Sequence, residues 1–207
     1  MHLVDLSVGM MGSTPIVGGT IPVAAGLAFA AQLRRENRVV VLFIGEGATE
    51  EGVFAEMLNF AALKKLPLLC VCENNLYSVY SPLSVRQAPQ RDRVALAAAH
   101  GLFARKGDGY QIEEVLALTQ EALAHIRQGL GTAFVEFDTY RFREHCGPHF
   151  DNHIGYRQEA EAMVWELRCP IRRWEQEQSP EEMSALKEEI AQEIADAFRF
   201  AEESPFP

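Results

Sequence analysis

Apolar residues along the chain fall into two recurring patterns. Continuous apolar runs of strand length, such as Val39–Ile44 and Leu68–Cys72, are typical of buried parallel strands. Between them, apolar residues recur at helical spacing, as in Ile112–Arg127. Because strand and helix alternate, we predict an α/β fold with a parallel sheet wrapped by helices on both faces. The predicted strands are residues 39–44, 67–75, 103–106 and 133–140. The predicted helices are residues 21–33, 94–99 and 112–127. We expect a further helix after Thr49 and three more after residue 156.

The ends of these elements carry local signals. We expect Val39–Ile44 to be covered on both faces, because the run has no polar side chain. Thr49 is expected to cap the helix after this strand, with two glutamates in the first turn of that helix. Residues 76–90 and 141–156 are expected to be loops, and the last helix is expected to begin at Pro180.

Length, charge and one uncharged segment limit the class of protein. The 207 residues suffice for one α/β domain, and we expect residues 1–170 to form it and residues 171–207 to add a helical C-terminal extension. The formal net charge of -10, with six histidines counted as neutral, argues against a nucleic-acid partner. Residues 6–33 contain no charged side chain, but prolines and glycines interrupt them. We therefore expect a buried loop and a buried helix there, and no membrane span.

The four cysteines are interpreted as reduced thiols of a cytoplasmic protein. Cys70 and Cys72 are two positions apart in a predicted buried strand. Their side chains should therefore point the same way into the packing.

Two oxygen-bearing side chains follow neighbouring predicted strands. Glu46 comes directly after one apolar run and Asn75 after the next, so both should lie at the carboxyl edge of the sheet, where such folds bind ligands. Their oxygens suit a hard cation such as Mg2+ or Ca2+, and the backbone carbonyl of Tyr77 could be a third ligand. Gly45 and Gly47 flank the acid and would let backbone approach a ligand closely. The alternative is a glycine-rich turn with a surface glutamate, followed by an ordinary Asn-Asn turn.

These motifs resemble a known family. Gly45-Glu46-Gly47 followed by Asn74-Asn75 is similar to the thiamine diphosphate motif, usually Gly-Asp-Gly and then Asn-Asn. The surrounding sequence resembles the alpha subunits of 2-oxoacid dehydrogenases of the pyruvate, branched-chain or acetoin type. The resemblance implies the thiamine diphosphate-binding fold and covers nearly the whole chain. Its clearest segments are residues 50–54, 59–67 and 73–78, with residues 16–22 similar to a loop that meets the cofactor and residues 139–145 similar to a phosphate-binding and catalytic loop.

The resemblance implies roles for individual residues. Arg141 would pair with a diphosphate oxygen, unless it is a surface arginine. His145 would act near the reacting carbon, unless it is a solvated loop histidine. Val17 would either pack on the cofactor or fill the core, and we give these two interpretations equal weight. The implied cofactor contacts are Val17, Gly18, Gly45, Gly47, Ala48, Asn75 and Arg141, and the implied Mg2+ ligands are Glu46, Asn75 and the Tyr77 carbonyl.

Three features depart from the family pattern. Glu46 replaces the commoner aspartate, as in branched-chain-type relatives. Arg143 stands where the family usually has a histidine, and residues 144–148 are atypical. Family alpha chains also carry a segment before the position of Met1 that contributes a Tyr-Arg pair to the diphosphate site, so we expect the site to be incomplete in this chain. A zinc site is an alternative for the loop, although the spacing of its ligand types fits no common pattern: His145, Cys146, His149 and His153.

The implied activity is that of a heteromeric enzyme. In this family the alpha subunit binds the diphosphate of thiamine diphosphate through Mg2+, and the assembled enzyme decarboxylates a 2-oxo acid and passes the acyl group to a lipoyl group, so we expect no turnover by this chain alone. The implied partners are a beta subunit, in an assembly of two alpha and two beta chains, and a lipoyl-bearing acyltransferase. The alternatives are a truncated, non-catalytic relative that acts as a binding or self-associating module, and a thiamine enzyme of acetoin or sugar metabolism.

Overall fold

The computed structural model describes residues 2–206, and the chain divides into two compact units, Met1–Trp165 and Glu166–Pro207. The division that we expected, after residue 170, lies a few residues further along. The first unit contains a four-stranded sheet in the order β1-β2-β6-β5, with every neighbouring pair parallel. This order confirms the predicted parallel sheet. The strands are β1 (Val40–Gly45), β2 (Leu68–Asn74), β5 (Phe103–Asp108) and β6 (Ala133–Asp138).

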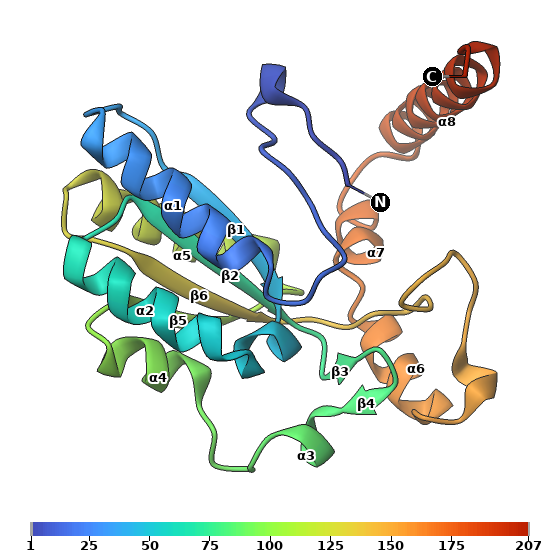
Figure 1. Cartoon of the computed structure of the whole chain (residues 1–207). Helices are drawn as coiled ribbons and strands as arrows, with labels where there is room; N and C mark the ends of the chain where they lie inside the picture. Colours follow the sequence, from blue (N-terminus) through green and yellow to red (C-terminus); the bar gives the residue numbers. More distant parts are fainter. Residues whose placement is uncertain (1, 207) are drawn as a thin grey trace. The chain divides into compact units, whose positions relative to one another are not determined.

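Helices cover both faces of this sheet, as predicted (Figure 1). On one face, the buried cluster includes Phe54, Leu58 and Phe134, together with the thiols of Cys70 and Cys72, which do point the same way. On the other face, Ile126 and its neighbours pack against alternate residues of β2 and β6. The first face carries α1 (Thr20–Leu33), α2 (Gly52–Lys64) and α4 (Arg93–Ala99), and the second carries α5 (Ile112–Arg127).

The expectation that the first strand is covered on both faces is wrong. Leu42 and Ile44 are buried against α1 and α2, but the alternate residue Phe43 is 64% exposed and Val41 is also exposed. The cause is the placement of α5, which packs against β2, β5 and β6 and leaves that face of the edge strand β1 uncovered.

The segment after β1 also differs from expectation. Residues Glu46–Glu50 form a 3-10 turn, η2, and α2 begins only at Gly52, with Glu51 as its N-cap residue. Thr49 does not cap the helix, because its hydroxyl donates a hydrogen bond to the carbonyl oxygen of Glu46 at 2.6 Å. The local turn thus competes successfully with helix capping for the threonine side chain.

The segments expected to be loops contain short elements. The strands β3 (Tyr77–Ser78) and β4 (Ser81–Pro82) form a hairpin, and α3 (Leu83–Arg86) follows it. The loop after β6 contains the 3-10 turn η3 (Asn152–Ile154) and leads into α6 (Glu159–Leu167).

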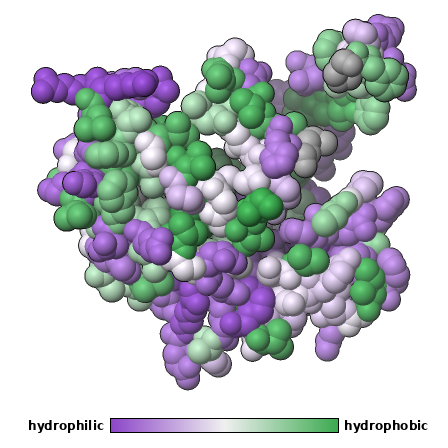
Figure 2. All heavy atoms as spheres, in the orientation of Figure 1, coloured by the Kyte–Doolittle hydropathy of each residue, from purple (hydrophilic) through white to green (hydrophobic). Residues whose placement is uncertain are grey.

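The chain before α1 is exposed, so the expectation of a buried loop is wrong. It contains the 3-10 turn η1 (Leu6–Val8) and one isolated bridge between Asp5 and Met10. Figure 2 shows hydrophobic residues at the surface over α1 and this lead-in. The exposed apolar side chains of the lead-in include Leu3, Val4, Leu6, Val8, Met10, Met11 and Ile16.

The second unit contains α7 (Pro170–Glu175) and α8 (Pro180–Glu203). The last helix begins at Pro180, as predicted, because Ser179 and Glu182 form a reciprocal capping box. Lys187 pairs with Glu175 at 3.1 Å and links the two helices. Among residues 2–206, no helix combines the length and apolar character that crossing a bilayer requires.

Candidate functional site

Glu46 and Asn75 leave neighbouring strands at the same edge of the sheet. In the parallel pairing of β1 with β2, Gly45 lies opposite Glu73. Glu46 therefore follows this aligned pair by one residue and Asn75 by two. Adjacent strands are about 4.8 Å apart, so the structure brings both residues to the carboxyl edge that the sequence predicted for them.

The Glu46 carboxylate is buried and paired with an arginine. Its side chain is 1% exposed, and its Oε1 accepts a hydrogen bond from Nη2 of Arg86 at 2.5 Å. Arg86 also donates through Nη1 to Glu50, and through Nε to the carbonyl oxygen of Ser81 at 3.1 Å. A buried carboxylate needs such a partner, because its desolvation is otherwise uncompensated. The alternative of a surface glutamate is therefore wrong.

The glycine turn packs closely against the β3–β4 hairpin. A Cβ atom at Gly47 would lie 2.9 Å from Oγ of Ser78, so a larger residue would displace the hairpin. Ala48 is buried next to it. The side-chain oxygen of Asn75 accepts a hydrogen bond from the backbone N–H of Tyr77 at 3.0 Å. The turn that follows Glu46 therefore contacts the hairpin that follows Asn75.

Tyr77 also anchors the hairpin through its side chain. Its hydroxyl donates a hydrogen bond to Oε2 of Glu161 in α6 at 2.6 Å. Burial, together with this hydrogen bond, raises the pKa of Tyr77 well above its ordinary value. The phenol therefore stays neutral and keeps its proton for the bond to Glu161.

Asn74, the first residue of the Asn-Asn pair, is structural. Its amide nitrogen donates to Glu136 and Asp138 on β6, both at 3.1 Å, and its amide oxygen accepts from the backbone N–H of Leu76 at 3.2 Å. These bonds tie the end of β2 to β6 and fix the direction in which Asn75 leaves the sheet.

Glu136 is the acid of a buried ion pair. It is 2% exposed although it lies in an apolar strand, and Arg93 contacts both of its oxygens, at 2.8 and 2.6 Å. Burial opposes the charge of Arg93, but the hydrogen bonds to Glu136 raise its pKa above the ordinary value. A polar residue in a buried strand requires a partner, but the identity of that partner cannot be read from the sequence.

Hydrogen bonds connect the two strand ends through this ion pair. Gln87 donates to Glu50 at 2.7 Å and accepts from Nη1 of Arg93 at 2.7 Å. A continuous chain of polar contacts, which we call the polar chain, therefore runs from β1 to β2. Its members in order are Glu46, Arg86, Glu50, Gln87, Arg93, Glu136 and Asn74.

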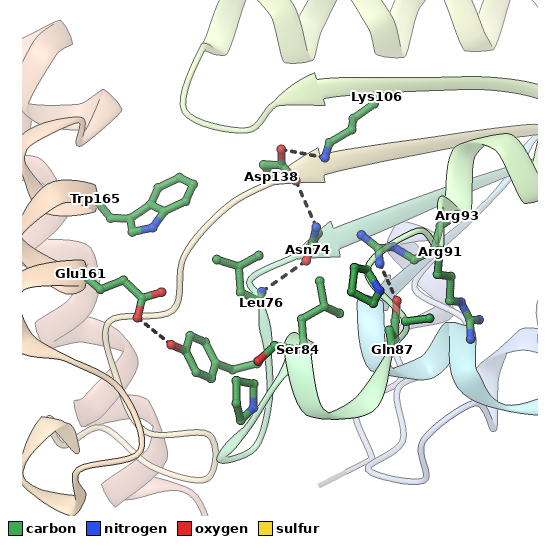
Figure 3. Close-up of a pocket in the computed structure, with 15 residues that line it drawn as sticks. Asn74, Leu76, Ser84, Gln87, Arg91, Arg93, Lys106, Asp138, Glu161 and Trp165 are labelled. Atoms are coloured by element: carbon green, nitrogen blue, oxygen red, sulfur yellow. Dashed lines mark hydrogen bonds and ion pairs between the residues drawn. The ribbon is translucent and has the colours of Figure 1, made fainter.

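A cavity of about 610 Å³ lies beside the polar chain (Figure 3). Asn74, Gln87 and Arg93 line it on one side, and the apolar side chain of Trp165 lies across from them. Lys106 lines it as well and pairs with Asp138 at 3.0 Å. Tyr77 is the predicted site residue that the cavity shares with the region around Glu46.

Val17 and Gly18 lie in the loop before α1. Val17 is 58% exposed, so it does not fill the core. Gly18 has a φ of +77°, and a Cβ atom there would lie 3.0 Å from Cγ of Glu51. Its left-handed conformation and its close approach to the start of α2 both require glycine.

Arg141 faces the interior rather than solvent. Its side chain is largely buried, its Nη2 donates to the carbonyl oxygen of Val79 at 2.6 Å, and its Nη1 lies 3.7 Å from Asp151. The Nε atom is buried and has no hydrogen-bond partner among the described residues. The alternative of a surface arginine is therefore wrong, and one buried donor of this side chain has no partner among the described residues.

Asp151 organises the loop after β6. Arg157 pairs with it at 2.5 Å, and the hydroxyl of Tyr156 donates to it at 2.8 Å. Burial opposes ionisation of Asp151, but these partners outweigh it and lower the pKa of the carboxyl below its usual value. His145 is exposed in the same loop. Within residues 2–206, no group of three or more His, Cys, Asp or Glu side chains is placed to hold a metal ion, so the zinc alternative has no support there.

The fold and the placement of the polar residues define the class of this protein. It is an α/β protein whose polar side chains gather beyond the carboxyl ends of parallel strands, the usual ligand-binding region of such sheets. The chain belongs to the dehydrogenase E1 component family, whose model matches residues 1–207.

Individual relatives match the chain over its full length. It is 32% identical over 214 residues to the alpha subunit of acetoin:2,6-dichlorophenolindophenol oxidoreductase of Bacillus subtilis, and covers 62% of that protein. It is 34% identical over 220 residues to the chloroplastic pyruvate dehydrogenase E1 component subunit alpha-3 of Arabidopsis thaliana, and covers 50% of it. A solved benzoylformate decarboxylase from Polynucleobacter necessarius is 20% identical, with a TM-score of 0.49, over 63% of this chain and 25% of that one.

Proposed function

We propose that this chain belongs to the alpha subunit of a thiamine diphosphate-dependent 2-oxoacid dehydrogenase, in which it binds the cofactor diphosphate through Mg2+. The observation that carries the proposal is the alignment of β1 with β2, which sends Glu46 and Asn75 from the same edge of the sheet toward one hairpin. The full-length match to the family supports it.

The donor chemistry fits a magnesium diphosphate. Mg2+ prefers oxygen ligands, and this region offers the Glu46 carboxylate, the Asn75 amide oxygen and the Tyr77 carbonyl. Gly45 has open space at its Cβ position, which supports a backbone approach to the diphosphate there, and Gly47 and Ala48 would continue this approach along the turn.

The remaining cofactor contacts come from two loops. The free Nε donor of Arg141 would bind a diphosphate oxygen. Val17, exposed beside Gly18, would pack on the cofactor. His145, exposed in the loop after β6, would lie near the reacting carbon.

When bound, the cofactor supplies the electron sink for decarboxylation of a 2-oxo acid. The residues of this chain would hold the diphosphate end and orient the rest. The acyl group would pass to a lipoyl group on an acyltransferase, and a beta subunit would complete the active site in a cytoplasmic assembly of two alpha and two beta chains. The relatives named pyruvate dehydrogenase subunits support this assignment.

A second candidate is an acetoin-oxidising thiamine enzyme. The Bacillus subtilis relative, an acetoin:2,6-dichlorophenolindophenol oxidoreductase subunit, favours it. Both candidates use the same cofactor site. Turnover of pyruvate and of acetoin, measured side by side with the assembled alpha and beta chains, separates them.

Calorimetry with thiamine diphosphate and Mg2+ tests the shared part of the proposal. We expect the chain, in the presence of a beta chain, to bind thiamine diphosphate in a Mg2+-dependent manner. We expect Asn75→Ala to abolish this binding. The circular dichroism spectrum should stay unchanged, because Asn75 follows a strand and lies outside the core. Asn37→Ala, an exposed site between α1 and β1, is the control. Unchanged binding by Asn75→Ala contradicts the ligand assignment. Absence of binding with and without the beta chain contradicts the proposed function and favours a non-catalytic module.

A further inference from the structure

The Glu46 carboxylate, proposed above as a metal ligand, already has a cationic partner. Nη2 of Arg86 lies 2.5 Å from its Oε1, and the acid is 1% exposed. A magnesium ion would approach a ligand oxygen to about 2.1 Å. A cation bound to this carboxylate would therefore lie close to the Arg86 guanidinium, and the two positive charges would repel each other.

We propose that Arg86 is the internal counter-ion of the cation site: it neutralises Glu46 when no metal is bound and must release Glu46 for the metal to bind. This inference rests on the proposed function, because it assumes that Glu46 is a ligand of the cofactor metal. Arg86 then acts as a positioning residue that sets how strongly the chain binds a divalent cation.

The other contacts of Arg86 allow this release. Its Nη1 donates to Glu50 and its Nε to the carbonyl oxygen of Ser81, and neither bond involves Glu46. Glu50 also accepts from Gln87 at 2.7 Å, so it stays hydrogen-bonded whichever way the guanidinium turns. Because the guanidinium is planar, its bonds to Glu50 and Ser81 would shift with it, so release of Glu46 requires Arg86 to move together with α3.

The element that carries Arg86 is small. Arg86 is the last residue of α3, a four-residue turn that follows the two-residue strand β4. Its guanidinium also lies 3.4 Å from the position of a Cβ atom at Gly47, so it borders the same turn that would receive the diphosphate. A small shift of α3 would therefore open the carboxylate without disturbing the four-stranded sheet.

A purely structural role of Arg86 gives a different expectation. In both cases Arg86→Gln destabilises the protein, because Glu46 is left buried without its partner. If Arg86 also competes with the metal for the Glu46 carboxylate, Arg86→Gln has a second effect. The carboxylate, freed from its partner, then binds a divalent cation more tightly than in the wild type. Metal affinity in the absence of any diphosphate therefore separates the two roles.

The test is Mn2+ binding to the full chain, followed by electron paramagnetic resonance without thiamine diphosphate. We expect Arg86→Gln to bind Mn2+ roughly ten- to a hundredfold more tightly than the wild type, the range of one charge-assisted hydrogen bond. Arg91→Gln is the matched control, because Arg91 donates instead to the carbonyl oxygen of Thr49 in the same turn. It should bind Mn2+ like the wild type. The double variant Glu46→Gln, Arg86→Gln should lose the gain, and Mn2+ should raise the melting temperature of Arg86→Gln more than that of the wild type.

Equal Mn2+ affinities of the wild type and Arg86→Gln overturn the inference, as does a gain that survives removal of the Glu46 charge. If Arg86→Gln does not fold, Arg86→Met carries the test, because methionine also removes the charge while its unbranched side chain fills similar space. Its Mn2+ affinity should exceed that of the wild type, and an affinity no higher overturns the inference. Calorimetry with thiamine diphosphate reports separately on the proposed function, so a failure of this inference is distinguishable from a failure of the proposed function.

Discussion

Replacing Arg93 by methionine would leave the Glu136 carboxylate buried without its main partner. The substitution removes both hydrogen bonds to this acid, at 2.8 and 2.6 Å, and the bond to Gln87 at 2.7 Å. Methionine fills similar space without a charge, so the loss is mainly electrostatic. The pair is deeply buried, with Glu136 2% exposed, and bulk water cannot replace the lost donors.

Breaking a buried ion pair from one side typically costs about 3–5 kcal/mol. Two donors remain near Glu136, namely Asn74 at 3.1 Å and Lys106 at 3.7 Å. They offset part of the loss, so we expect Arg93→Met to lower the free energy of unfolding by about 3 kcal/mol. Removing both charges, with Arg93→Met and Glu136→Leu together, should bring the loss down to about 1 kcal/mol, the value of the hydrogen bond that Gln87 still lacks.

Unfolding by guanidinium chloride, followed by circular dichroism with linear extrapolation, measures these changes. Arg105→Met is the matched control, because Arg105 pairs with Glu121 at 3.0 Å on the surface. It should cost less than about 1 kcal/mol. The reasoning is refuted if Arg93→Met costs no more than this control, or if adding Glu136→Leu makes the loss larger.

Two further predictions concern titration and thiol chemistry. The pKa of Asp151 is lower in the folded protein than that of an ordinary aspartate, so its stabilising contribution is present above the ordinary pKa and is lost as the pH falls through the folded pKa. The stability difference between the wild type and Asp151→Asn should therefore shrink between about pH 5 and pH 2, and a difference independent of pH would contradict this. Burial raises the pKa of Cys70 to about 12 and also raises that of Cys72, whereas Cys146 is exposed. A thiol reagent should modify Cys146 in the native protein well before the two buried cysteines, as peptide mass spectrometry would show, and equal rates would argue against the buried β2.

Hydrophobic periodicity predicted the elements that pack as regular layers. The helix over Ile112–Arg127 has the predicted bounds, because its apolar residues form one stripe over the sheet. The strand that ends near Asn75 was predicted equally well, because a short continuous apolar run is typical of a buried strand. Coverage of the faces was not predictable, because an apolar run such as Val40–Gly45 looks the same whether one of its faces or both are buried.

The polar chain could not be read from the sequence. Arg86, Gln87 and Arg93 lie in and after a segment without periodicity, and their acidic partners are far away along the chain. Such pairs form only after the sheet has brought its strand ends together. Glu136 was the one local signal, because a charge within a buried strand requires a partner. Glu50 misled the prediction, since a glutamate after a turn suits the first turn of a helix as well as it suits an arginine.

The exposed side of β1 bears on how this polypeptide behaves in concentrated solution. β1 is an outer strand of the sheet, and no strand within residues 2–206 pairs with its free edge. Unpaired backbone groups beside an apolar Phe43 form a template that a strand from another molecule can extend. Handled on its own, the polypeptide therefore carries an intrinsic tendency to aggregate by strand addition, which salt would do little to suppress because the contact is not ionic.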